Sequence, residues 1–261
     1  MPRQRRHKKR TRRPARFPGL YKAVSALAIA GAVVVACLVF FRVGDIVVQG
    51  NTRYTDQEII QVAGVELGDN LFTIRGSKVS RQLQSKLPYV RTVSVRSALP
   101  GTVIITITEA DAAAAVGQDG RWWLLDSQCK LLEETTGPQG HATVTGLTPV
   151  APAVGTYLAT GEETAQRLSD LREFLAAMEE HGLLEGLNSV DLSEDYRITF
   201  VYGGRLTVHL SPTLDKGMSY WLRRFGAALE HPSVMENLDY TVEIMDSQRV
   251  RFIPDQEKQG S

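Results

Sequence analysis

Histidine, serine and acidic side chains are the groups in this chain that could carry acid–base, nucleophilic or metal chemistry. A zinc site on one helix or strand needs paired histidines, in spacings such as His-Glu-x-x-His or His-x-His, and neither spacing occurs. The histidines that follow the N-terminal tail stand singly, at His141, His181, His209 and His231. We therefore predict that the chain holds no metal and that each of these histidines is a surface or strand residue.

Serine-based acyl transfer would need a lysine three residues after the serine, or a Gly-x-Ser-x-Gly turn. Ser77 and Ser211 have no lysine at that offset, and Gly-x-Ser-x-Gly does not occur. The adjacent acids Glu133-Glu134 and Glu162-Glu163 are interpreted as solvated faces rather than as an acid–base pair. Gly203-Gly204 lacks the Lys-Ser/Thr of a phosphate-binding loop. The sequence thus predicts a protein that is not an enzyme and binds no cofactor.

The two cysteines are too far apart in the expected topology to form a disulfide. Cys37 lies inside an uncharged apolar segment, whereas Cys129 lies far beyond it. We expect Cys129 to be a small, half-buried structural side chain on a strand rather than a reactive thiol.

The apolar segment runs for 19 residues without a charge, from Ala23 to Phe41. A helix of this length rises about 28 Å at roughly 1.5 Å per residue, which is enough to cross the hydrocarbon core of a bilayer. The preceding tail holds ten basic residues and no acid: Arg3, Arg5, Arg6, Lys8, Lys9, Arg10, Arg12, Arg13, Arg16 and Lys22. By the positive-inside rule the tail stays in the cytoplasm. We predict a single-pass type II protein of the plasma membrane, with everything after Arg42 outside the cytoplasm.

Three other readings of the N-terminus compete with a retained anchor. A cleavable signal peptide is disfavoured, because the apolar run exceeds the usual core of about 7 to 15 residues. The residues Val34-Val35-Ala36-Cys37 match a lipoprotein signal, although the apolar run continues past Cys37 to Phe41. Arg12-Arg13 fits a twin-arginine signal, but such pairs are common in basic tails. We favour the retained anchor.

Charge is divided unevenly between the tail and the rest of the chain. Removing the ten basic residues of the tail from the total of 30 leaves 20 against 29 acidic residues, a net charge of −9 for residues 23–261. An acidic ectodomain has no general attraction for nucleic acid. The tail suits anionic lipid headgroups, at about 1 kcal/mol per nearby charge. Nucleic-acid binding by the tail is the alternative, and no recognisable nucleic-acid-binding fold accompanies it.

The first 70 or so residues after the apolar segment show the order strand, helix, helix, strand, strand. Thr55 followed by Glu58 forms a capping box, Gly64 ends the first helix, and Pro88 ends the second. Period-two alternation around the turn at residues 97–101 indicates a hairpin. The expected elements are a strand at 45–49, helices at 56–63 and 77–86, and strands at 92–96 and 103–107.

This order, directly outside a membrane anchor, resembles a POTRA domain. Three segments add to the likeness: "VVQGN" at 47–51, "LGDNLF" at 67–72 and "LPYVRTVSVRSALPGTVIITITE" at 87–109. With its basic tail, single span and β-rich continuation, the chain is similar to the FtsQ/DivIB family of bacterial cell-division proteins. It departs from the family at residues 109–112, which read Glu-Ala-Asp-Ala without the expected proline, so the join between the domains stays open.

The remainder of the chain predicts a β-rich domain with one or two helices. A helix at 162–181 places Ala165, Leu168, Leu171, Leu175 and Met178 on its buried face and Glu163, Arg167, Arg172 and Glu179 on its solvent face. A second helix is expected at 214–229. Strand pairs are expected at 122–125 with 130–132, at 198–202 with 206–210 around a two-residue turn, and at 240–244 with 249–252.

The fold class is therefore α+β: an N-terminal transmembrane helix, a POTRA domain (β-α-α-β-β) and a β-rich domain. The predicted division is a cytoplasmic tail at 1–22, a transmembrane helix at 23–41, a POTRA domain at 42–111, an extracytoplasmic β-domain at 112–253 and a C-terminal tail at 254–261.

The resemblance implies a non-enzymatic scaffold of the bacterial divisome, at the division septum, that coordinates septal cell-wall synthesis. In the family the last strands of the β-domain receive the partners FtsB/DivIC and FtsL. The matching residues here are Arg249, Val250, Arg251 and Phe252, and an unpaired edge strand can bind a partner segment through main-chain hydrogen bonds. The alternative is an internal strand whose arginines only oppose aggregation. The POTRA domain would be a second contact surface.

Two functions of other classes compete with the scaffold. A secretion or outer-membrane assembly protein would bring several POTRA repeats or a barrel, and a single copy with a membrane helix argues against it. A cell-wall enzyme with an unfamiliar site would need a cleft with convergent polar groups.

Overall fold

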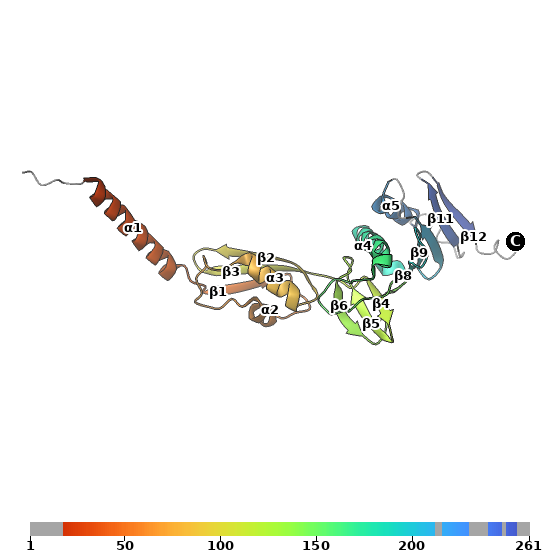
Figure 1. Ribbon diagram of the computed structural model, residues 1–261, viewed down its shortest axis with the longest axis horizontal. Coiled ribbons are helices and arrows are strands. Elements are labelled where there is room, and N and C mark those ends of the chain that lie inside the picture. Colours follow the sequence, from red (N-terminus) through yellow and green to blue (C-terminus); the bar gives the residue numbers. More distant parts are fainter. Residues whose placement is uncertain (1–17, 212–215, 230–239, 247–248, 255–261) are drawn as a thin grey trace, which may run out of the picture.

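The computed structural model describes residues 18–211, 216–229, 240–246 and 249–254, and it confirms the α+β class. The chain passes from one apolar helix through a small sheet to a larger one (Figure 1). Residues 1–17 of the predicted basic tail lie outside the described residues, as do His231, Leu214 and the residues after Pro254.

Helix α1, Pro18–Phe40, extends away from both sheets (Figure 1). Its segment Tyr21–Phe40 has a mean hydropathy of 2.7 and none of it is buried against the protein. By length and composition this helix can cross a membrane, which fits a membrane-anchored protein. The possible lipoprotein signal at residues 34–37 lies inside the helix, which continues for three residues beyond Cys37.

The smaller sheet has the strand order β1-β3-β2, with β1 parallel to β3 and β2 antiparallel to β3. Helices α2 and α3 pack against it and bury an apolar core that includes Ile59, Leu83 and Ile105. The elements are β1 Asp45–Gln49, α2 Asp56–Ala63, α3 Gly76–Lys86, β2 Val90–Ala98 and β3 Thr102–Glu109. This is the predicted β-α-α-β-β order, and the bounds of β1 and α2 are those expected from the sequence.

Local signals set the ends of α2. The Thr55 hydroxyl accepts from the Glu58 N–H at 3.3 Å, and the Glu58 carboxylate accepts from the Thr55 N–H at 2.8 Å. Gly64 ends the helix in the left-handed region at φ 63°. Gly50, at φ 84°, turns the chain after β1, and a Cβ there would lie 2.2 Å from the Ile107 carbonyl oxygen.

The larger sheet has nine strands in the order β12-β11-β10-β9-β8-β7-β4-β5-β6. The pairs β4–β7, β7–β8 and β10–β11 are parallel, and the other pairs are antiparallel. The strands are β4 Ala114–Gln118, β5 Arg121–Leu125, β6 Leu131–Thr135, β7 Ala142–Thr145, β8 Leu187–Asp191, β9 Ile198–Tyr202, β10 Leu206–Leu210, β11 Tyr240–Asp246 and β12 Arg249–Pro254.

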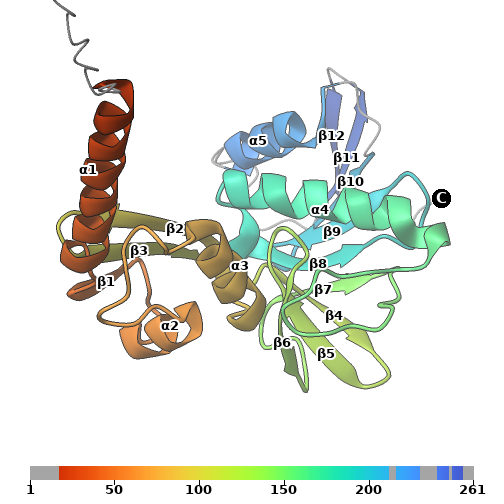
Figure 2. The same cartoon turned by 60° about the vertical axis from the view of Figure 1, so that its left-hand side comes forward.

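Two helices, α4 Ala165–Glu180 and α5 Met218–Leu229, supply most of the helical part of the larger core. Short 3₁₀ turns precede α4 at Glu162–Thr164 and β8 at Leu184–Gly186. Figure 2 shows α4 running beside the middle strands of the sheet. Phe174 of α4 and Phe225 of α5 both contact the ring of Phe200 in β9, which joins the helices to the sheet.

The structure corrects three expectations for this second region. Ala165 is exposed because it begins the helix beyond the core, whereas Phe174 and Ala177, which were not expected there, are buried. Arg167 and Glu179 are half-buried rather than on a solvent face, because Arg167 bonds to the Gly146 carbonyl and Glu179 to Arg91 and Ser127. The turn between β9 and β10 has three residues, because Tyr202 pairs with Leu206.

The domain boundary at residues 111 and 112 stays a prediction. The two sheets part between Glu109 and Ala114, and the segment between them contains the departure from the family sequence. Ala110 packs with Tyr89 and Leu132 in a small apolar cluster that joins the two sheets.

Candidate functional site

The candidate partner-binding strand, β12, lies at one end of the nine-stranded sheet. It contains the four residues expected from the sequence, Arg249, Val250, Arg251 and Phe252, and extends to Pro254. It pairs antiparallel with β11 on one side, and no described strand lies on its other side. Among the described residues, its outer main-chain N–H and C=O groups therefore form a sheet edge of the kind that accepts an added strand.

The edge strand is joined to the core through β11. Phe252 is the register partner of Val242, a fully buried residue of the larger core, and Val250 is the partner of Ile244. A register shift between Ile244 and Asp246 marks an irregularity near the start of β12. Strand β11 in turn pairs with β10, so the edge is positioned by a continuous ladder rather than by a free loop.

The opposite edge of the sheet, at β6, contacts the smaller sheet. The Tyr89 hydroxyl donates to the Glu133 carboxylate at 2.8 Å, and the Tyr89 N–H donates to the Tyr54 hydroxyl oxygen at 3.2 Å. The Arg53 guanidinium lies 3.7 Å from the centre of the Tyr89 ring, in cation–π geometry. Burial, together with the bond to Glu133, raises the pKa of the Tyr89 hydroxyl, so it remains a donor at neutral pH.

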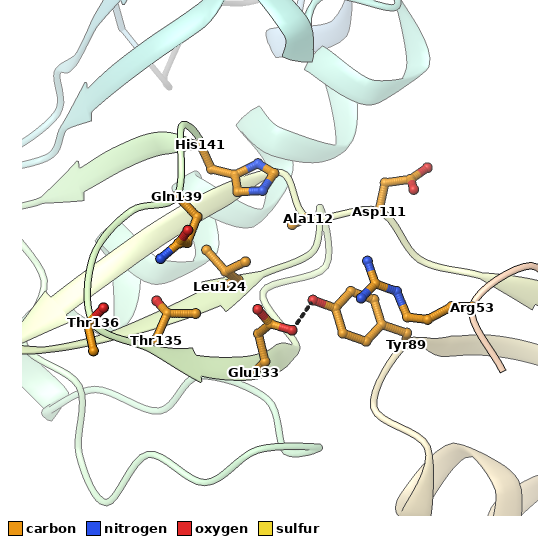
Figure 3. A pocket seen from close by; sticks show the side chains of 10 residues that line it. All are labelled: Arg53, Tyr89, Asp111, Ala112, Leu124, Glu133, Thr135, Thr136, Gln139 and His141. Carbon is orange, nitrogen blue, oxygen red and sulfur yellow. Dashed lines mark hydrogen bonds between the residues drawn. The ribbon is translucent and has the colours of Figure 1, made fainter.

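An open pocket of about 660 Å³ lies at this contact (Figure 3). It is lined by Arg53, Tyr89, Asp111, Ala112, Leu124, Glu133, Thr135, Thr136, Gln139 and His141. Its arginine and one of its carboxylates are already engaged by Tyr89. The contacts in this pocket thus connect the two sheets.

A second polar cluster joins the sheets through α4. Arg91 donates two hydrogen bonds to the Glu179 carboxylate, at 3.0 and 2.8 Å, and the Ser127 hydroxyl donates to the same carboxylate at 2.6 Å. Burial alone would raise the pKa of Glu179, but the bonds from Arg91 and Ser127 together outweigh it and lower that pKa. The half-buried carboxylate is thus an ion that holds residues 91, 127 and 179 together.

Ser127 and Lys130 have the Ser-x-x-Lys spacing of an acyl-transfer site, which the sequence interpretation overlooked. The Lys130 ammonium donates to the main-chain carbonyls of Gln84 and Val90, at 3.0 and 3.2 Å. Ser127 instead donates to Glu179. Burial lowers the pKa of Lys130. Lys130 thus bonds across the contact between the sheets, whereas Ser127 bonds to α4 beside the larger sheet, and neither described bond joins the two side chains.

Cys129 lies in the turn between these residues and not on a strand. It is fully buried, at φ 60°, and the neighbouring Asp126 carboxylate accepts from the N–H groups of Gln128 and Lys130 at 2.9 Å each. Burial raises the pKa of the Cys129 thiol to about 12, although Arg172 acts in the opposite direction. The expectation of a half-buried strand residue was wrong in both position and burial, and the thiol is protonated at neutral pH.

The described histidines that the sequence singled out lie in separate places. His181 is bonded to the carbonyl and hydroxyl oxygens of Ser219, and His209 to the Thr199 hydroxyl, each at 2.9 Å. His141 lines the pocket at the sheet contact. Within the described part of the chain, no three His, Cys, Asp or Glu side chains are grouped so as to hold a metal ion.

Comparison with known proteins gives the family of the first domain. Residues 41–110 match the family model described as "POTRA domain, FtsQ-type". The chain is 31% identical over 117 residues to the cell division protein FtsQ of Corynebacterium glutamicum, covering 43% of this chain and 52% of that protein. It is 30% identical over 141 residues to FtsQ of Geotalea daltonii, covering 52% and 50%.

A relative with the other family name also matches. The chain is 28% identical over 96 residues to the cell division protein DivIB of Clostridium acetobutylicum, covering 37% of this chain and 38% of that protein. The chain thus spans about half the length, or less, of these curated relatives.

Proposed function

This chain is a member of the FtsQ/DivIB family, and from that premise we propose that it is a non-enzymatic scaffold of the bacterial divisome. Each of the matched relatives is a cell division protein by name. The polar clusters at the sheet contact support a structural reading, because Ser127, Lys130, Glu133 and Glu179 all bond to protein groups there.

The membrane anchor in this proposal is α1. Its exposed apolar surface and 20-residue span suit the bilayer, and the ten basic residues of the tail favour a cytoplasmic N-terminus. The POTRA and β-domains would then lie outside the plasma membrane, at the division septum. Labelling intact cells with a membrane-impermeant reagent tests this orientation, and a protected ectodomain would contradict it.

The partner site is the free side of β12, and its position at the end of the sheet carries the proposal. Segments of partners resembling FtsB/DivIC and FtsL would add to this edge as further strands. Main-chain hydrogen bonds would supply affinity and alternate side chains would supply specificity. Holding these partners outside the membrane would let the chain coordinate septal cell-wall synthesis.

Binding assays between the full-length chain in detergent and each candidate partner test the site. We expect Val250→Asp and Phe252→Asp to abolish binding, because each substitution places a carboxylate next to the side chains of the added strand. Phe252 shares register with buried Val242, so the thermal unfolding of each variant is measured alongside. Tyr196→Asp is the matched control, since Tyr196 is 72% exposed on the loop between β8 and β9. Unchanged binding by folded Val250→Asp and Phe252→Asp would place the contact elsewhere.

A further inference from the structure

The loop at residues 67–72, called here the proximal loop, is bonded to the end of the membrane helix. The side-chain amide of Asn70 donates to the carbonyl oxygens of Cys37 and Leu38, at 3.2 Å each. The Leu71 N–H donates to the Phe41 carbonyl at 3.0 Å. The last carbonyls of a helix have no partner within it, and in a bilayer they would have no water either. The proximal loop therefore caps α1 where α1 leaves the membrane.

The loop also pairs with the chain just after the helix. The Val43 N–H donates to the Asp69 carbonyl at 2.8 Å, and the Gly68 N–H donates to the Val43 carbonyl at 2.7 Å. Arg42 and Asn70 form an antiparallel bridge. Because these bonds flank the helix end, the loop is held next to α1 with no flexible linker between them.

Apolar side chains on this loop are exposed. Leu67 is 69% exposed and Phe72 is 64% exposed, and the Phe72 ring meets the Phe41 ring edge-on at 5.3 Å. Leu99, 64% exposed, lies in the β2–β3 turn at the same end of the small sheet, where the Gly101 carbonyl accepts from the Gly44 N–H at 2.7 Å. Two separate loops thus present apolar side chains beside the end of α1.

The length of α1 indicates the depth in the bilayer at which these side chains lie. The 20 residues of Tyr21–Phe40 rise about 30 Å, the thickness of the hydrocarbon core, so Phe40 lies near its boundary. The proximal loop is bonded to residues 37–43, within about one helical turn on either side of that boundary. This depth is the headgroup region, where partly apolar loops can insert their side chains.

Charges around the loop do not favour a purely electrostatic contact. Arg42 is exposed, but so are Asp45, Glu66 and Asp69, and the Asp69 carboxylate accepts from the Glu66 N–H at 3.0 Å. Contact would come from apolar insertion rather than from attraction to anionic lipid.

We propose that Leu67 and Phe72, with Leu99 beside them, insert into the lipid leaflet in which α1 ends and so hold the POTRA domain against the membrane surface. The proposal rests on the proposed anchoring of the chain by α1. We assign lipid as the partner of this surface, because the surface is continuous with a helix that lies in lipid in the same proposal.

The test uses the full-length chain in phosphatidylcholine vesicles. Cysteines introduced as Leu67→Cys and Phe72→Cys, in a Cys37→Ser background, carry an environment-sensitive fluorophore, and Cys129 is kept because its fully buried thiol is closed to the reagent. We expect quenching by lipids spin-labelled at headgroup depth, a blue-shifted emission and protection from aqueous iodide. A Tyr196→Cys label, on an equally exposed side chain of the β-domain, should show iodide quenching and no lipid quenching. Melting curves confirm that each labelled chain is folded.

The possible outcomes distinguish the proposed lipid contact from the proposed anchoring by α1. If the label at 72 is as open to iodide as the label at 196, the lipid contact is wrong. Protection from iodide without lipid quenching means that protein covers the surface, which also overturns it. A label on the native Cys37 reports the anchor independently, because Cys37 lies about one helical turn inside the boundary of the hydrocarbon core, and failure of lipids spin-labelled just below the headgroups to quench it would contradict the spanning of α1. Normal quenching at Cys37 with none at 72 overturns the lipid contact alone.

A second variant tests the apolar side chains themselves. A label at Leu99→Cys reports the same surface from the other loop. Adding Leu67→Asp and Phe72→Asp should reduce lipid quenching at residue 99, because two charges replace the inserted side chains. Unchanged quenching at 99 would show that Leu67 and Phe72 do not hold the domain to the membrane.

Discussion

The two edges of the nine-stranded sheet are used differently. At β6 the Leu131 N–H donates to the Thr156 carbonyl and the Gly155 N–H donates to the Leu131 carbonyl, both at 2.8 Å. Tyr89 of the POTRA region bonds to Glu133 of the same strand. At β12 no described segment pairs with the outer side. Within the described parts of the chain, one edge is thus covered by the chain itself, and the other has no strand on its outer side, which is the side we propose for a partner.

This difference relates the anchor to the proposed partner site. Because β6 contacts the POTRA domain, which α1 leads into directly, the sheet is attached at its membrane-near end (Figure 1). The β12 edge lies at the far end of the strand order. A partner added there would extend the same sheet and be linked to the membrane through it.

The largest effect is expected at β12, from proline at Val250 or Arg251. In an antiparallel ladder the N–H groups of consecutive residues point alternately to the two sides. At one of the two positions proline therefore removes a hydrogen bond to β11 and lowers the melting temperature. At the other it removes an N–H donor from the free edge and leaves the melting temperature unchanged. We expect the variant that keeps its melting temperature to lose partner binding by at least about tenfold, or 1.4 kcal/mol. Normal binding by this folded variant would exclude strand addition.

Removing the Glu179 carboxylate should weaken the covered side and leave the free edge unchanged. Glu179→Ala leaves the half-buried Arg91 and the fully buried Ser127 without this acceptor, so we expect the free energy of unfolding to fall by about 2 kcal/mol. Glu173→Ala, an exposed position on α4, is the control. Denaturant titration measures the loss, and a matching loss in partner affinity would contradict the separation of the two edges.

Tyr89→Phe probes the covered edge more finely. The ring that packs beside Arg53 is kept, and the hydrogen bond to Glu133 is lost. We expect the free energy of unfolding to fall by about 1 kcal/mol. Thermal unfolding measures it, and no change would mean that the bond contributes nothing to the contact between the sheets.

Acid should weaken the contact between the two sheets by protonating Glu179. Its pKa is lowered in the folded chain, so its stabilising contribution is present above the usual glutamate pKa of about 4.3 and is lost as the pH falls through the lowered value. We expect the stability difference between the natural chain and Glu179→Gln to shrink below about pH 4. Parallel denaturant titrations from neutral pH downward measure this, and a constant difference would contradict the assignment.

Structural features that depend only on neighbouring residues in the sequence were predictable. The Thr55–Glu58 capping box and Gly64 set the ends of α2 through bonds to their own backbone. The apolar run of α1 and the alternation of the hairpin strands are likewise local, and their elements appear where expected. The small strands β4, β7 and β8 were not located individually, because short buried strands lack a clear period.

The contacts between the sheets were not predictable. The helical pattern placed Glu179 on a solvent face, yet Arg91, 88 residues earlier, bonds to it. Ser127 and Lys130 have a catalytic spacing, but their partners come from distant segments, so the spacing alone would have misled.

The sequence alone determined that this protein has an apolar segment able to span a membrane, a β-α-α-β-β domain after it and a strand at residues 249–252, because hydropathy, capping and alternation act between near neighbours. Only the tertiary structure decided that β12 ends the strand order, that β6 is covered and that residues 67–72 cap the membrane helix. These depend on pairings between residues tens of positions apart, which no local pattern encodes.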